Sequence, residues 1–270
     1  MRQQLQGIAM IGLIPAGGMA TRLGPLPCSK ELLPVGAFVT PDGMRPRPVI
    51  TYLLAQWQRA SIERALIVVR PGKWDIPAYL GDGRAFGPNL AYLTVHEPHG
   101  AAYTLAAALP FLAGETVALG LPDVILVPDD VYATLVAHHT AHQPDLTLGL
   151  FPCPTPQTAD MVALAGDQRR VTAIEIKPAQ THLQWTWMAA IWSPTVTDVL
   201  AEVVAADRLA RQQEPNRVEL HIGVVFQAAI ARGLRVDGVI FPQGSALDIG
   251  TPAGWAAVTA SNGAPPRLTP

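Results

Sequence analysis

The sequence predicts an α/β protein with a Rossmann-like, doubly wound and mostly parallel sheet. Strand-like apolar runs alternate with helix-like stretches through residues 1–150, an order typical of parallel βαβ units with right-handed crossovers. Several runs are apolar throughout, such as Ala65 to Val69, and such runs are typical of strands buried on both faces of a sheet. The chain has 270 residues, 49% of them apolar, so it can fill one large α/β core.

The expected elements of the first half follow in regular order. An apolar run over 8–14 is expected to form the first strand and to end in a loop of small residues. Proline-rich residues 41–48 interrupt the pattern, and we expect an irregular excursion there. The remaining elements expected in this half are helices over 49–60, 76–80, 101–112 and 131–142 and strands over 65–69, 90–95, 116–121 and 146–151.

Beyond residue 151 the pattern changes, and a smaller β-rich subregion is expected. Residues 161–165 and 171–177 flank a Gly-Asp turn and predict a hairpin. The other expected elements are a strand over 184–192, helices over 194–206 and 219–231, an extended segment over 234–241 and a last helix over 252–260. We expect a single domain over 1–262, followed by a Pro-rich tail over 263–270.

Charge and cysteine content exclude several classes of partner. With 19 basic and 21 acidic residues the net charge is -2, so neither nucleic acid nor a membrane surface is expected as a partner. The N-terminal apolar run spans about nine residues, too few to cross a bilayer, and we interpret it as the first strand instead of a signal peptide. Cys28 and Cys153 fit neither a disulfide framework nor a zinc pattern. Reduced thiols in a cytoplasmic protein are therefore expected.

The loop after the first strand has the composition of an anion-binding loop. Residues 13–36 read LIPAGGMATRLGPLPCSKELLPVG. Gly17 and Gly18 let the backbone N–H groups approach an anion closely, and Arg22 and Lys30 can neutralise a triphosphate. A Gly-Gly pair alone would favour an ordinary turn, so the prediction depends on the whole string.

The whole string resembles the signature loop of the sugar-phosphate nucleotidylyltransferases, a family that includes glucose-1-phosphate thymidylyltransferases and mannose-1-phosphate guanylyltransferases. The matching residues are Pro15, Ala16, Gly17, Gly18, Thr21, Arg22, Leu23, Ser29, Lys30, Leu32, Leu33, Pro34 and Val35. The family's next glycine is replaced by Ala20, which would cost ~1 kcal/mol or more if the position requires a positive φ. Three further segments, 97–123, 174–178 and 247–252, match in the right order.

The resemblance implies a nucleotide-binding half over 1–150 and an acceptor-binding half over 151–262. It implies catalytic roles for Arg22, Lys30 and Lys177, and nucleotide contacts from Ala16, Gly17, Gly18, Thr21, Glu97, Gly100 and Asp123. The glutamine that thymidylyl- and uridylyltransferases place before Glu97 corresponds to Val95. The nucleobase is therefore left open.

Two aspartates are implied to bind Mg²⁺. Asp123 and Asp248 each stand at a turn beside an apolar run, where either could be an ordinary turn or cap residue. In the family the matching carboxylates jointly hold Mg²⁺ at the α-phosphate, which suits a hard cation that prefers oxygen ligands. We therefore expect both carboxylates to lie beside the anion-binding loop.

The acceptor side departs from the family. Lys177 matches the lysine that contacts the acceptor phosphate, but Ile176 replaces the glutamate that binds sugar hydroxyls. Met161 and Met188 stand where glycines line the family's sugar pocket. The expected acceptor pocket is more apolar, and the identity of the sugar cannot be carried over.

The resemblance implies transfer of a nucleotidyl group from an NTP to a sugar 1-phosphate, with in-line attack at the α-phosphate and release of pyrophosphate. A regulatory relative that binds nucleotide without turnover is the alternative, supported by the departures at Ala20, Met161, Ile176 and Met188. A dinucleotide-dependent oxidoreductase is weaker, because the loop lacks the G-x-G-x-x-G pattern. A homo-oligomer is compatible with all three hypotheses.

Overall fold

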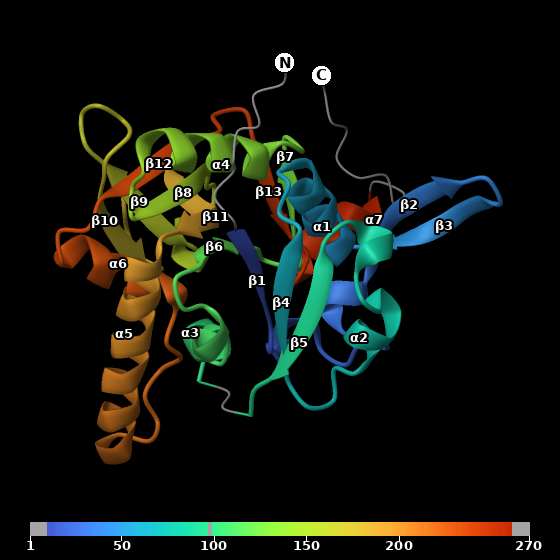
Figure 1. Cartoon of the computed structure of the whole chain (residues 1–270), viewed down its shortest axis with the longest axis horizontal. Coiled ribbons are helices and arrows are strands. Elements are labelled where there is room, and N and C mark those ends of the chain that lie inside the picture. Colours follow the sequence, from blue (N-terminus) through green and yellow to red (C-terminus); the bar gives the residue numbers. More distant parts are fainter. Residues whose placement is uncertain (1–9, 97–98, 261–270) are drawn as a thin grey trace.

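A nine-stranded sheet forms the centre of the protein in the computed structural model, which describes residues 10–96 and 99–260 (Figure 1). Its main path follows the order β10-β9-β11-β6-β1-β4-β5, and β11 also pairs with β8, which pairs with β12. The strands are β1 (Met10–Ala16), β4 (Arg64–Val69), β5 (Asn89–Thr94), β6 (Thr116–Leu119), β8 (Leu146–Pro152), β9 (Asp160–Leu164), β10 (Val171–Ile176), β11 (Trp185–Trp192) and β12 (Val236–Ile240). Only β10 and β11 run opposite to the other strands of this sheet. The predicted, mostly parallel sheet is confirmed.

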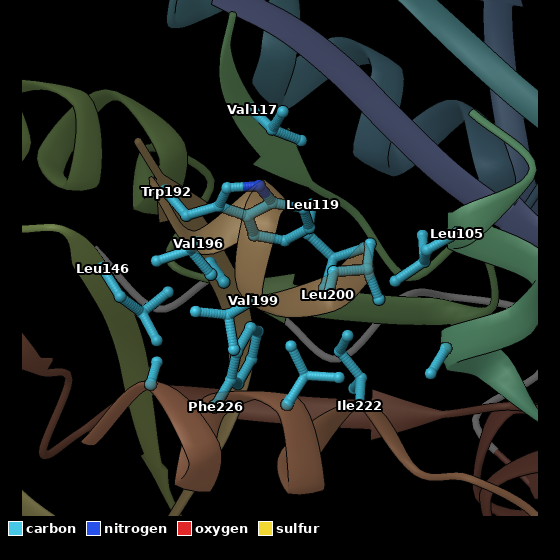
Figure 2. Packing of buried hydrophobic residues seen from close by; sticks show 14 of the residues in the cluster. Leu105, Val117, Leu119, Leu146, Trp192, Val196, Val199, Leu200, Ile222 and Phe226 are labelled. Atoms are coloured by element: carbon cyan, nitrogen blue, oxygen red, sulfur yellow. The ribbon is translucent and has the colours of Figure 1, made fainter. Parts of the chain in front are cut away.

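Helices cover both faces of the sheet, because the central strands alternate their apolar side chains between two cores. Leu13 packs in one core, and its neighbour Ile14 packs in the other. The first core contains residues of α3 (Ala101–Ala106), α5 (Pro194–Gln213) and α6 (Ile222–Ala231), and the second contains residues of α1 (Ile50–Arg59), α2 (Asp75–Leu80) and α4 (Val131–His142). Figure 2 shows part of the first core, where Val199 and Leu200 of α5 and Phe226 of α6 meet Trp192 of β11. The doubly wound arrangement is therefore confirmed.

Residues 34–48 form a hairpin where an irregular excursion was expected. Within the described part of the chain, strands β2 (Pro34–Thr40) and β3 (Gly43–Pro48) pair only with each other, and the hairpin projects from the body of the molecule (Figure 1). Prolines are tolerated here because both strands are edges, so a missing N–H breaks no ladder. The expectation failed because proline was taken as a sign of irregular structure.

Three helix boundaries also differ from the expected ones. Helix α3 ends at Ala106 and is followed by a 3₁₀ turn at Leu109–Phe111, since Pro110 cannot continue an α-helical ladder. Helix α5 continues to Gln213 because buried Asp207 pairs with Arg211 one turn later, with 2.6 Å between Oδ2 and Nε. Helix α6 starts at Ile222.

A second, two-stranded sheet was not expected from the sequence. Strand β7 (Val124–Val127) pairs in antiparallel fashion with β13 (Ser245–Asp248), and Asp248 lies opposite Val124. A third apolar cluster supports it, with Ile125, Ile249 and Val258 of α7 (Pro252–Ala260) among its members. This sheet joins the chain after β6 to the chain before α7.

The helices of residues 10–96 and 99–260 give no sign of a membrane span, since none is both long enough and apolar enough to cross a bilayer.

Candidate active site

The loop after β1 opens into a cavity of about 650 Å³. Strand β1 lies between β4 and β6, so its carboxyl end reaches the middle of the parallel strands, where ligands bind in open α/β sheets. The predicted site residues that line this cavity are Gly17, Gly18, Thr21, Arg22, Lys30, Gly100, Asp123, Met188 and Asp248. Ala16 is fully buried beneath the loop.

The two predicted carboxylates lie together. The pairing of β7 with β13 places Asp248 beside Asp123, and the N–H of Ile249 donates to the carbonyl of Asp123 at 2.9 Å. Gly250 lies against both side chains: an ideal Cβ on it would stand 2.4 Å from Asp123 Oδ2 and 3.0 Å from Asp248 Oδ1. Both carboxylates therefore face one small volume beside the loop.

Two basic side chains of the loop neutralise these carboxylates. Lys30 Nζ forms an ion pair with Asp123 Oδ2, and Arg22 Nη2 lies 3.7 Å from Asp248 Oδ2. Burial alone would lower the pKa of Lys30, but the carboxylates of Asp123 and Glu31 outweigh it and raise that pKa. Burial, and then the charge of Asp123, raise the pKa of Asp248.

The carboxylate pair fits a Mg²⁺ site that is completed by substrate. Among residues 10–96 and 99–260 no three or more His, Cys, Asp or Glu side chains gather as a metal cluster. Mg²⁺ commonly takes only one or two protein carboxylates and fills its remaining positions with water and phosphate. The raised pKa of Asp248 shows that the second negative charge is disfavoured here, and a bound cation would remove that penalty.

Ala20 occupies the left-handed region, with φ 55° and ψ 28°. The position therefore has a positive φ in this chain, and alanine is strained there. We expect Ala20→Gly to stabilise the chain by up to about 1 kcal/mol, since relief of strain exceeds the added freedom of the unfolded chain. Urea unfolding would measure the change.

Ser61→Gly provides the control for this prediction. Ser61 is exposed and has φ 57°, but it lies in the turn before β4 and away from the loop. We expect both variants to gain stability and only Ala20→Gly to change nucleotide affinity. Equal affinity in the two variants would mean that strain at Ala20 does not shape the anion-binding loop.

The side of the cavity near Gly100 is closed by the chain before α6. Gly100 has φ 106°, and an ideal Cβ would stand 2.7 Å from the carbonyl oxygen of Leu220. Glu219 lines the cavity; it was missed because an exposed glutamate carries no distinctive sequence signal. Glu97 lies outside the described residues, whereas Val95 lines the cavity.

The predicted acceptor residues are only partly brought together. Met188 lines the cavity, but Met161 is completely buried and does not. Lys177 also lies outside the cavity lining, and its Nζ is 3.4 Å from His221 Nε2. Lys177 follows β10, whose pairing with β9 places it beside α6 instead of beside the loop.

The fold and the loop define an α/β protein with a candidate anion-binding loop at the carboxyl end of its central parallel strand. The chain belongs to the nucleotidyl transferase family, whose model matches residues 11–262. It is thus an enzyme of the nucleotidyl-transferring type.

Known proteins resemble the chain over most of its length. A glucose-1-phosphate thymidylyltransferase of Mycolicibacterium smegmatis is 29% identical over 231 residues, covering 83% of this chain and 75% of the relative. A glucose-1-phosphate thymidylyltransferase of Streptomyces griseus is 29% identical over 202 residues, and the match covers 74% of this chain but only 54% of that relative. The fold is shared with a Bacillus anthracis structure assigned as a glucose-1-phosphate thymidylyltransferase, with a TM-score of 0.79, 22% identity and coverage of 96% and 97%.

Proposed function

We propose that the protein transfers a nucleotidyl group from an NTP to a sugar 1-phosphate and releases pyrophosphate. The observation that carries the proposal is the convergence of Asp123 and Asp248 with Lys30 and Arg22 beside the anion-binding loop. Family membership and the names of the relatives support the same reaction.

The site residues would act by positioning and charge neutralisation. The acceptor phosphate oxygen attacks the α-phosphorus in line, the bond to the bridging oxygen breaks, and pyrophosphate leaves. Arg22 and Lys30 would stabilise the negative charge on the departing pyrophosphate. Mg²⁺ held by Asp123 and Asp248 would supply charge neutralisation at the α-phosphate.

Lys177 remains the proposed contact for the acceptor phosphate. Its long side chain would have to turn from His221 toward the cavity to make that contact. Met188 would form an apolar part of the acceptor wall.

Pyrophosphate release tests the proposal directly. The protein would be incubated with each of the common NTPs and a panel of sugar 1-phosphates in the presence of Mg²⁺, with release as the readout. Release that requires both substrates supports the transferase. Tight NTP binding without pyrophosphate release from any combination of substrates would favour the regulatory relative. The panel of NTPs would also identify the nucleobase, which Val95 leaves open.

Turnover is expected to fall in acid at a pH that depends on Mg²⁺. Because the pKa of Asp248 is raised by burial and by Asp123, this carboxyl takes up a proton at a higher pH than an ordinary aspartate. Protons and metal then compete for the same carboxylates. The acid limb of kcat/KM should therefore move to lower pH when Mg²⁺ is raised tenfold, and a limb that stays in place would argue against metal binding at Asp248.

A further inference from the structure

The segment that carries Lys30 is anchored at two points to residues that follow β4: Lys73 in the loop and Asp75, the first residue of α2. The backbone N–H and the hydroxyl of Ser29 both donate to the carboxylate of Asp75, each at 2.7 Å. Glu31 lies two residues after Ser29, and both of its carboxylate oxygens accept hydrogen bonds from Lys73 Nζ, at 2.7 and 2.8 Å. The anchors therefore stand directly before and after Lys30.

The second anchor is a buried ion pair. Glu31 is 0% exposed and Lys73 is 8% exposed. Burying two charges is costly, and an apolar pair of similar volume is often as stable or more stable. A contribution to stability alone therefore does not explain the presence of this buried pair. Its location suggests a second role.

The location links the pair to the proposed site. Lys30 lies in a short 3₁₀ turn at Lys30–Leu32, with its ammonium group at Asp123. The Glu31 carboxylate is also close enough to Lys30 to favour its charged form. Lys73 lies in the loop that follows β4, and Asp75 is the first residue of α2. The chain is thus tied, on each side of Lys30, to the segment that joins β4 to α2.

We propose that the buried Glu31–Lys73 pair, with Ser29–Asp75, holds Lys30 where it meets the phosphates of the bound NTP. Glu31 and Lys73 are positioning residues: they act through Lys30 and do not touch the substrate. The inference rests on the proposed function, since the role of Lys30 belongs to that function.

The double variant Glu31→Met/Lys73→Met tests the proposal. It removes both charges together, so neither is left buried without a partner, and the chain should keep its fold with a melting temperature near that of the wild type. We expect kcat to fall by about 10- to 100-fold, because a displacement on the order of 1 Å at a catalytic group can cost about 100-fold. KM for the NTP should change less, because Lys30 acts mainly on charge that develops in the transition state.

The split between kcat and KM, read together with the melting temperature, separates positioning from mere structural support. A variant that is only destabilised would lose folded protein and melting temperature, whereas a displaced Lys30 lowers kcat in protein that is fully folded. A double methionine variant with wild-type kcat, or one whose loss of kcat only follows a loss of folded protein, would overturn the proposal.

The controls keep this test independent of the proposed function. The exposed pair Arg232–Glu202, with 2.7 Å between Nη2 and Oε2, can be replaced by two methionines and should leave kcat unchanged. If the wild type releases no pyrophosphate from any substrate, the proposed function has failed, and Mg²⁺–NTP affinity becomes the readout. Affinity weaker in the Glu31→Met/Lys73→Met variant than in the Arg232→Met/Glu202→Met control would still support the positioning role, and equal affinity in the two variants would overturn it.

Discussion

Asp123→Asn is expected to lower turnover by about 10²- to 10³-fold while the fold is retained. The substitution keeps the shape of the side chain but removes one of the two charges proposed to hold Mg²⁺. It also deprives Lys30 of its ion-pair partner. Pyrophosphate release measures the loss, and circular dichroism with thermal unfolding verifies the fold.

Asp42→Asn is the matched control for this prediction. Asp42 has a 79% exposed side chain in the projecting hairpin, where it pairs with Arg45, and surface pairs of this kind contribute little. We expect wild-type turnover from it. Wild-type turnover from Asp123→Asn as well would rule out the mechanism proposed for the carboxylate pair.

The central sheet could be predicted because its sequence signal is local. A strand buried on both faces must be apolar at every position, and Ala65 to Val69 satisfies this requirement without reference to the rest of the chain. Pro110 gave an equally local signal, since proline ends a helix. The apolar pattern continues past Pro110, however, and the predicted helix was extended with that pattern. Predicted helix ends were less accurate for this reason.

The sheet that carries the two carboxylates could not be predicted in the same way. Strands β7 and β13 have four residues each, too few to show a period, and their pairing joins distant segments. The resemblance to a family predicted that Asp123 and Asp248 lie close together. The structure gives the reason for their proximity: the register of β7 and β13 sets Asp248 opposite Val124.

The support for Lys30 was also invisible in the sequence. Glu31 and Lys73 are separated by 42 positions, and each would pass for a solvated surface residue. Their burial and mutual contact are properties of the tertiary structure alone. Short motifs therefore identified the loop, but not the residues that hold it.

Gly250→Ala is expected to reduce turnover by about 100-fold or more through the addition of one methyl group. The new Cβ would stand 2.4 Å from Asp123 Oδ2 and 3.1 Å from Lys30 Nζ, so at least one of these side chains must move. A displacement of this size at a catalytic centre costs about 100-fold. The φ of Gly250 is not among the positive values, so alanine fits the backbone and the fold should persist.

Gly166→Ala separates this steric effect from a general cost of replacing glycine. Gly166 also avoids positive φ, and apart from its chain neighbours no atom of residues 10–96 and 99–260 lies within 4 Å of its ideal Cβ, so none of these residues obstructs the added methyl group. We expect turnover and melting temperature to match the wild type there. If Gly250→Ala also kept wild-type turnover, the volume between the two carboxylates would not be where the reaction takes place. Loss of turnover with an unchanged melting temperature would instead place the chemistry in that volume, because the only group added is a methyl that lies between Asp123, Asp248 and Lys30.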